Sequence, residues 1–233
     1  MKAMPLSLAV ALAIGLAVPA APVARAADTP AASTPAVPAW VARSNEFSQI
    51  LLKAQAPFAP EEASFFGIPG YDEQVYDLKP KVGERFRAAM ARAKTELQAK
   101  LAVEKDPNVR QDLQILVDAA DRNIQSSTLN EQYMLPWSDV AQNVFTGLQA
   151  LLSDQTPPDR RAHALARLRN YAGLGDGTTP LAQLAKDRYT ERLGDASLTR
   201  PSKMEVEQAL ANVDTCIKGI DDLFAKYRIE GAQ

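Results

Sequence analysis

Apolar side chains recur along much of this chain at intervals of three and four residues, the spacing that places side chains on one face of an α-helix. No alternation typical of a β-strand extends beyond a few residues. We therefore expect an all-α protein, a multi-helix bundle of about seven helices with no substantial sheet. Besides a short helix from Pro60, the stripes predict helices over residues 40–51, 80–103, 107–125, 138–152, 157–171, 180–193 and 201–227.

The last stripe is the longest, and its spacing alternates between four and three residues. This heptad pattern is typical of a seam for antiparallel packing or a coiled coil, although an ordinary core helix of a bundle is the simpler explanation. Thr199 is expected to cap this helix with Pro201 just inside it, as Asp106 and Pro107 do for the helix over 107–125. The seam consists of Val206, Leu210, Val213, Ile217, Ile220, Phe224 and Tyr227.

The first 26 residues have the organisation of a secretory signal peptide. Lys2 supplies a positive charge, residues 6–18 are uncharged and mostly apolar, and Ala24 and Ala26 fit the small-residue pattern of a cleavage site. Because a membrane-spanning helix needs about 20 apolar residues, cleavage is favoured over an uncleaved anchor. The mature protein is then expected in the periplasm or outside the cell. Residues 27–38, rich in Ala, Pro and Thr, predict a flexible tether before a helical domain over 39–233.

Charge and cysteine content narrow the range of partners. Cleavage would remove Lys2 and Arg25 and leave 24 basic against 28 acidic side chains, a net charge of about −4. This balance argues against nucleic acid or an anionic membrane surface as the partner. Cys216 is the only cysteine, so no intramolecular disulfide can form, and its helical setting is typical of a small buried hydrophobe.

Residues that commonly carry catalysis are scarce. His163 is the only histidine, so one imidazole and one thiol fall short of the several ligands that a zinc site needs. A Ser-His-Asp triad would have to use His163, yet no Gly-x-Ser-x-Gly motif accompanies it. We expect His163 on a helix among arginines, where it is either exposed to solvent or supports a functional residue without itself touching substrate. The residues therefore predict no catalytic, cofactor-binding or metal-binding site in this chain.

Two stretches carry a more specific pattern. The first contains LLKAQAP at 51–57, ASFFG at 63–67 and the pair Tyr71-Asp72, and the second lies at 206–232 and includes Gly219-Ile220 and Lys226-Tyr227. On these motifs the chain resembles, over residues 40–232, the bacterial family known as domain of unknown function 885.

The resemblance implies an all-helical, secreted protein that looks like a zinc metallopeptidase. Family members are usually much longer, and their metal-binding signature, His-Glu-x-x-Pro-Gly-His, lies in the later half. No position here matches that signature. Zinc is therefore expected only in a full-length relative, and this chain is expected to be inactive alone.

Two interpretations of the whole chain stay open. It is either the N-terminal part of a longer hydrolase whose metal-binding half is absent here, or a stand-alone periplasmic protein that binds a partner, or itself, through the seam. The pair Tyr71-Asp72 is likewise open. It lines the substrate cleft of a complete enzyme, or it forms a turn in which Asp72 accepts backbone hydrogen bonds and Tyr71 packs its ring, and turn chemistry favours the second.

Overall fold

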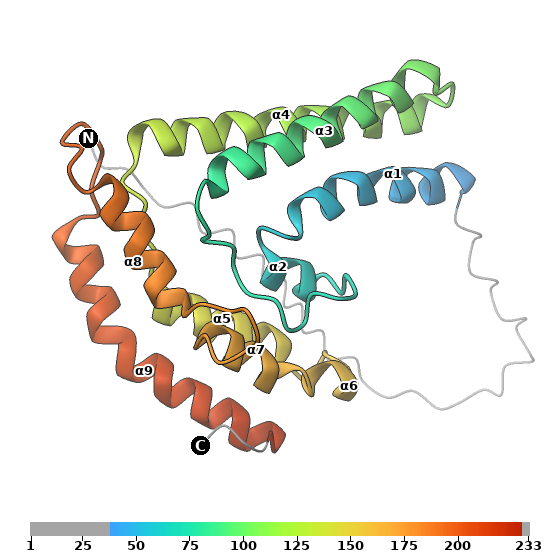
Figure 1. The fold of residues 1–233 in the computed structure, drawn as a ribbon. Coiled ribbons are helices and arrows are strands. Elements are labelled where there is room, and N and C mark those ends of the chain that lie inside the picture. Colours follow the sequence, from blue (N-terminus) through green and yellow to red (C-terminus); the bar gives the residue numbers. More distant parts are fainter. Residues whose placement is uncertain (1–37, 230–233) are drawn as a thin grey trace, which may run out of the picture. The chain divides into compact units, whose positions relative to one another are not determined.

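The computed structural model describes residues 38–229, and this part of the chain contains nine α-helices and no β-strand (Figure 1). The predicted all-α class is therefore confirmed. Ala24, Ala26 and nearly all of the predicted tether lie outside the described residues. Within them, no helix has the length and apolar character needed to cross a membrane. The helices are α1 (Ala39–Gln55), α2 (Pro60–Phe65), α3 (Val82–Val103), α4 (Pro107–Tyr133), α5 (Val140–Leu151), α6 (Pro158–Arg161), α7 (Ala164–Tyr171), α8 (Leu181–Arg192) and α9 (Lys203–Tyr227).

Helices α1, α3 and α4 share one apolar core. α3 and α4 form an antiparallel hairpin, and α1 packs against both (Figure 1). The predicted stripes of these helices point into this core, where Met90, Leu97 and Leu113 are fully buried. The three helices are thus held together mainly by apolar burial, at about 25 cal/mol for each Å² removed from water.

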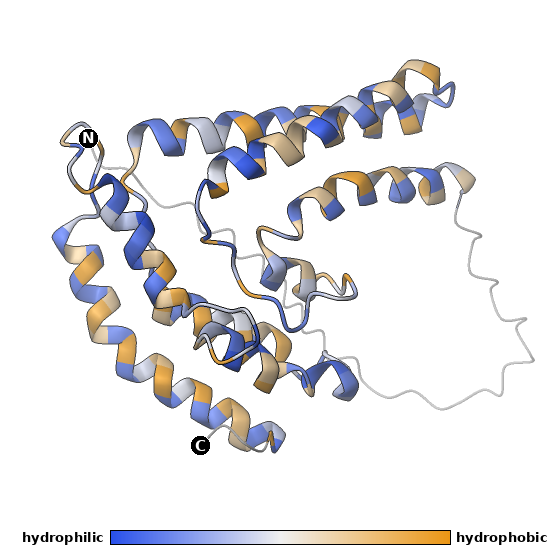
Figure 2. Ribbon diagram, viewed as in Figure 1, coloured by the Kyte–Doolittle hydropathy of each residue, from blue (hydrophilic) through white to orange (hydrophobic). Residues whose placement is uncertain are grey.

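A second core forms around α5, which contacts α2, α7, α8 and α9. α5 suits this central position because apolar residues such as Val140, Val144 and Leu148 lie along it. Figure 2 shows orange bands of apolar residues along α9, which packs against it. Its residues Leu148 and Leu151 are buried against Leu181 of α8 and Phe224 of α9.

Helix α4 confirms one prediction and extends another. The Asp106 side chain accepts hydrogen bonds from the backbone of Asn108 (2.9 Å) and Val109 (3.5 Å), so it caps α4 with Pro107 at the first position, as expected. The helix continues two turns beyond its predicted end. The residues of this extension are mostly polar and have no apolar stripe. Arg87 of α3 forms an ion pair with Glu131 there, a contact across the hairpin that stabilises the extension.

Two local predictions were wrong. The segment expected to form one helix over 157–171 is broken into α6 and α7 at Ala162-His163. Thr199 does not cap α9. Its backbone pairs with the end of α4, accepting from Leu135 N (2.9 Å) and donating to Tyr133 O (2.8 Å), and Ser202 instead forms a capping box with Glu205.

Candidate functional site

The segment between α2 and α3, residues 66–81, is the most heavily anchored loop among the described residues, and we call it the clamped loop. It starts with a tight stop to α2. Gly67 adopts φ +76°, its N–H donates to Ser64 O (2.9 Å), and Ile68 N–H donates to Ala63 O (2.9 Å). These two bonds define a Schellman motif, whose left-handed position favours glycine. The turn at ASFFG is therefore fixed by the backbone itself.

Asp72 joins the clamped loop to α6. Its carboxylate accepts hydrogen bonds from Ser64 Oγ (2.6 Å) and from Arg160 Nη2 (2.6 Å) and Nε (2.9 Å). Arg160 also donates to Ser64 O (2.6 Å), so one guanidinium holds both α2 and the loop. Burial raises the pKa of Asp72, but the hydrogen bonds from Arg160 and Ser64 outweigh it and hold that pKa below its usual range.

A second arginine holds the same loop from the inside. Arg167 of α7 is fully buried, and it donates to Tyr71 O (2.8 Å) and to Gly147 O of α5 (2.8 Å). Burial lowers the pKa of this guanidinium. Over residues 38–229, no carboxylate forms a direct hydrogen bond with it that would offset this effect of burial. Its Nε has no hydrogen-bond partner among the described residues. Arg167 therefore ties two backbone carbonyls together at the cost of a desolvated charge.

Next to Arg167, a buried tyrosine donates to a glutamate. Tyr171 Oη lies 2.6 Å from Glu61 Oε1, and the same oxygen accepts from Tyr76 N (2.8 Å). Burial, followed by the charge of Glu61, strongly raises the pKa of Tyr171, so the phenol keeps its proton. The close approach depends on Gly147, where a Cβ atom would lie 2.2 Å from Tyr171 Oη.

The far half of the clamped loop is anchored to a different helix. Arg85 of α3 donates to Asp77 through Nη1 (2.5 Å) and Nη2 (3.0 Å). Burial raises the pKa of Asp77, but the hydrogen bond from Arg85 outweighs it, so the pKa is lowered overall. Arginines from three helices, α3, α6 and α7, thus fix the loop along its length.

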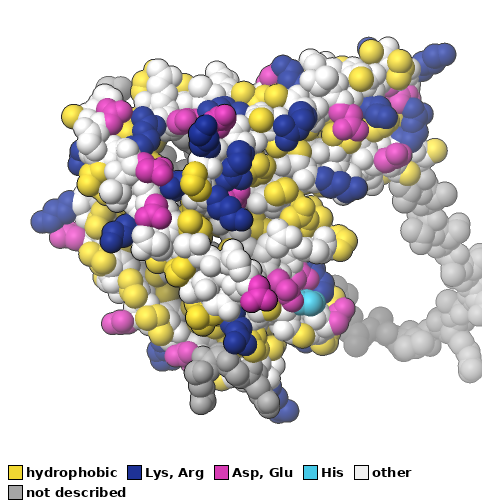
Figure 3. All heavy atoms as spheres, viewed as in Figure 1, with side chains coloured by type: hydrophobic (Ala, Val, Ile, Leu, Met, Phe, Trp, Pro, Cys, Tyr) yellow, Lys and Arg dark blue, Asp and Glu magenta, His cyan; other side chains and the backbone are white. Residues whose placement is uncertain are grey.

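The only histidine also contacts this loop. His163, at the break between α6 and α7, lies with Nδ1 2.6 Å from Glu73 Oε1, and both side chains are about half exposed. Figure 3 shows the cyan imidazole among acidic side chains. The side chain is exposed, as expected, but the expected helical position is wrong, because His163 lies at the break between α6 and α7 and its imidazole contacts the carboxylate of Glu73.

No metal site is found in the described part of the chain, where no three His, Cys, Asp or Glu side chains are placed to share an ion. Glu73 and His163 provide only two donors. Cys216 is buried on α9, and burial raises the pKa of its thiol, which matches the expectation of a small buried hydrophobe.

The structure answers part of the question about Tyr71 and Asp72. The Tyr71 carbonyl accepts a turn hydrogen bond from Gln74 N–H (3.3 Å), and Asp72 lies inside this turn. However, Asp72 accepts from the side chains of Ser64 and Arg160 rather than from backbone groups, and the backbone of Tyr71, not its ring, is the part that Arg167 holds. Whether the pair lines a cleft stays a prediction.

The clamped loop leaves an apolar pair facing outward. Phe65 and Phe66, at the end of α2, are 65% and 63% exposed, and their rings meet edge to face with centroids 5.5 Å apart. Exposed aromatic residues on a rigid turn are typical of binding surfaces, because little entropy is lost when a partner covers them.

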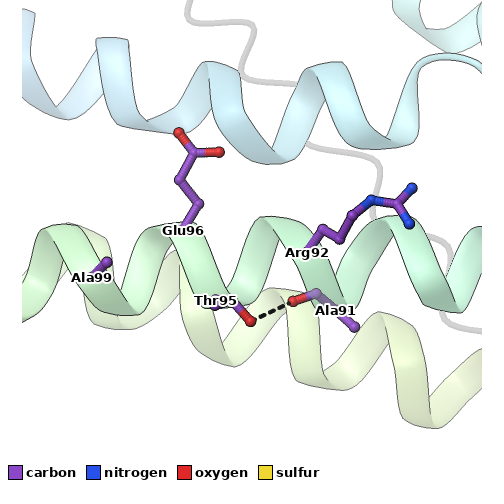
Figure 4. Close-up of a pocket in the computed structure, with 5 residues that line it drawn as sticks. All are labelled: Ala91, Arg92, Thr95, Glu96 and Ala99. Carbon is purple, nitrogen blue, oxygen red and sulfur yellow. Dashed lines mark hydrogen bonds between the residues drawn. The ribbon is translucent and has the colours of Figure 1, made fainter.

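Two surface depressions lie elsewhere. One, of about 460 Å³, is a shallow hollow on α3 lined by Ala91, Arg92, Thr95, Glu96 and Ala99 (Figure 4). Its only internal hydrogen bond, from Thr95 Oγ1 to Ala91 O (3.0 Å), is a local helix contact, and its charged side chains do not converge. We assign it no chemistry.

The other depression, of about 470 Å³, is an apolar groove between the start of α5 and residues 206–220 of α9. Five of the seven seam residues line it, and binding of a partner there stays a prediction. The groove is lined by Trp137, Ser138, Asp139, Val140, Ala141, Val144, Val206, Ala209, Leu210, Val213, Cys216, Ile217 and Ile220.

The arginines that hold the clamped loop were missed by sequence reasoning. A signal for Arg167 did exist. It lies three residues after Ala164 and four before Tyr171, both buried, so it occupies a core position of α7. A charged residue at such a position predicts a buried polar network. No local signal identifies Asp72 as the partner of Arg160.

Comparison with known proteins gives one result. The family model described as "Bacterial protein of unknown function (DUF885)" matches residues 60–232. The match includes the clamped loop, all three of its arginines and the seam, but not α1 or the LLKAQAP stretch. No match was found among the curated proteins or among the solved structures. On the family match, this chain belongs to the DUF885 family of bacterial proteins.

Proposed function

We propose that this chain is the non-catalytic helical portion of a secreted, metallopeptidase-like hydrolase, and that its clamped loop forms one wall of the substrate cleft. The observation that carries the proposal is the rigid exposed turn at Phe65-Phe66. It lies within the family match, and it is held through the carbonyl of Ser64 by Arg160, while the fully buried Arg167 holds the loop further on, at the carbonyl of Tyr71.

The physical argument concerns what the anchoring achieves. A loop rich in Pro and Gly would ordinarily move freely, and a mobile wall would lose entropy each time substrate bound. Fixing the loop in advance removes that cost. Two adjacent aromatic rings then offer an apolar surface suited to peptide side chains, while the metal and its ligands would come from another segment of the hydrolase.

The test uses the purified chain alone and together with a separately produced DUF885 segment that carries the His-Glu-x-x-Pro-Gly-His signature. With a mixture of peptides and added Zn²⁺, the chain alone is expected to bind no stoichiometric zinc and to hydrolyse nothing. The two segments together are expected to hydrolyse peptide. Zinc-dependent hydrolysis by the chain alone would overturn the proposal.

A double substitution tests the wall itself. Phe65→Ala with Phe66→Ala is expected to lower kcat/KM of the combined segments about tenfold or more, since each lost apolar contact contributes about 1–3 kcal/mol. Val103→Ala, at a 74% exposed position on α3, is the matched control and should leave kcat/KM unchanged. Equal kcat/KM for all three proteins would remove the loop from the cleft.

A stand-alone periplasmic protein that binds a partner is the second candidate function. The specific observation that favours it is the exposure of two seam residues, Leu210 and Ile217, which are 68% and 54% exposed.

A further inference from the structure

The first part of α9 is covered on one side only. α9 packs on α5 through Leu223 and Phe224, and the Cys216 thiol lies 3.9 Å from Gln142 Oε1 of α5. Gly219 brings the two helices close, because a Cβ atom there would lie 2.6 Å from the ring of Phe145. On the other side of the seam, Leu210 and Ile217 face solvent.

The open side of the seam has an acidic border. Glu207, Asp214 and Asp221 are spaced seven residues apart, so they form a row beside Leu210 and Ile217, and all three are exposed. Of the three, only Glu207 has an ion pair in the described part of the chain, an exposed one with Lys203 at 3.5 Å.

The opposite wall of the groove is also apolar with an acidic group. Trp137, which is 40% exposed, and Val140 and Val144 supply the apolar surface, and Asp139 lines the same groove. The Asp139 carboxylate caps α5, accepting from Gln142 N (3.0 Å). Carboxylates therefore border the groove on both walls.

This arrangement argues against a second copy of the chain as the occupant. If two α9 helices paired antiparallel with Leu210 opposite Ile217, each acidic row would face the other, because equivalent flanking positions meet in an antiparallel pair. Asp214 would oppose its own copy, and Glu207 would oppose Asp221. Like charges in register disfavour the pairing.

We propose that the groove between α5 and α9 binds a basic amphipathic helix of a partner polypeptide. The partner's apolar residues, spaced three and four apart, would cover Leu210, Ile217 and Trp137, as in other helix-in-groove complexes. Its Lys or Arg side chains would face the acidic row and Asp139. This inference uses α9 and α5 only, so it stands or falls separately from the proposed cleft wall.

The test measures binding of two synthetic helical peptides by fluorescence anisotropy. They share the same Leu positions, but one carries Lys and the other Glu at every flanking position. The Lys peptide is expected to bind at least tenfold more tightly, and raising the salt concentration should reduce the difference because exposed charges are screened. Absence of binding by either peptide, or equal affinities for both, would overturn the proposal.

Matched variants locate the binding surface. The double variant Asp214→Lys with Asp221→Lys is expected to abolish the preference for the Lys peptide, and Leu210→Ser to weaken both peptides at least fivefold. Asp118→Lys, at an exposed position of α4, is the control and should change neither affinity. If the double variant still preferred the Lys peptide, the assigned surface would be refuted. It would also be refuted if sedimentation showed that the chain alone forms a dimer and that Leu210→Ser dissociates this dimer.

Discussion

Replacing Gly147 with alanine sets two effects of opposite sign against each other. On helix propensity alone, the change stabilises α5 by about 1 kcal/mol. In this fold, however, the new methyl group would lie 2.2 Å from Tyr171 Oη and 2.9 Å from Glu61 Cγ. The phenol must move, which strains the buried packing by about 1–3 kcal/mol and breaks its hydrogen bond to Glu61, worth about 1.5–3 kcal/mol to a charged acceptor.

The net expectation is a loss of about 2–5 kcal/mol in the free energy of unfolding. Urea unfolding followed by circular dichroism measures it directly. With a denaturant slope of about 2 kcal/mol per molar urea, the midpoint should fall by roughly 1–2.5 M. Gly83→Ala in the first turn of α3 is the control, because the nearest atoms there are the mobile ends of Arg87 and Glu131 at 3.1 Å. It should be neutral or stabilise by up to about 1 kcal/mol.

A double variant identifies the cause. Tyr171→Phe alone loses the hydrogen bond to Glu61 but also removes the oxygen that the new methyl group meets. Gly147→Ala combined with Tyr171→Phe should therefore cost at least about 1 kcal/mol less than the sum of the single losses. The assigned contact would be refuted if Gly147→Ala were as stable as the unmodified protein. It would also be refuted if the stability losses of the two single variants summed to the loss in the double variant.

Three other outcomes are expected. The lowered pKa of Asp72 means that its ion pair stabilises the fold above the unfolded pKa of about 3.9 and that this contribution is lost as pH falls through the lower folded value. Urea midpoints measure how much less stable Asp72→Asn is than the unmodified protein. This difference should shrink below about pH 4, and a difference that stays constant with pH would contradict the assignment. Because Ser202 caps α9, Ser202→Ala should lower the stability measured by thermal unfolding by about 1 kcal/mol, whereas Thr199→Ala should change it little. Equal losses in the two variants would contradict the assignment of Ser202 as the cap. The predicted signal peptide is tested by Ala24→Arg, which should block cleavage after Ala26 and leave a longer precursor visible by mass spectrometry.

The sequence predicted the elements better than their connections. Apolar spacing identified most of the helices, and Asp106-Pro107 marked the start of α4, because these signals lie within a few residues of their effect. The extension of α4 pairs Glu131 with Arg87, more than 40 positions earlier in the chain, and local pattern could not show this contact. At the break between α6 and α7, His163 likewise contacts Glu73, 90 positions earlier.

The candidate site was even less accessible from sequence. The motif around Tyr71 and Asp72 drew attention to the correct loop, yet its partners Arg160 and Arg167 come roughly 90 residues later. A surface arginine and a buried one look alike in composition, and only the position of Arg167 between buried neighbours on α7 separates them. The acidic row on α9 was visible as a spacing of seven, but its meaning required knowing which side of the helix α5 covers.

The anchoring of residues 66–81 has a consequence for survival beside a peptidase. Cleavage requires a segment to leave its fold and extend through an active site, and exposed turns with Gly67, Pro69 and Gly70 are usual places for nicking. Here the arginine side chains would have to release Asp72, Asp77 and the carbonyl of Tyr71 before the backbone could extend. The sequence of this loop is typical of a protease-sensitive turn, yet its anchoring makes it a poor substrate, even for the peptidase whose cleft we propose it borders.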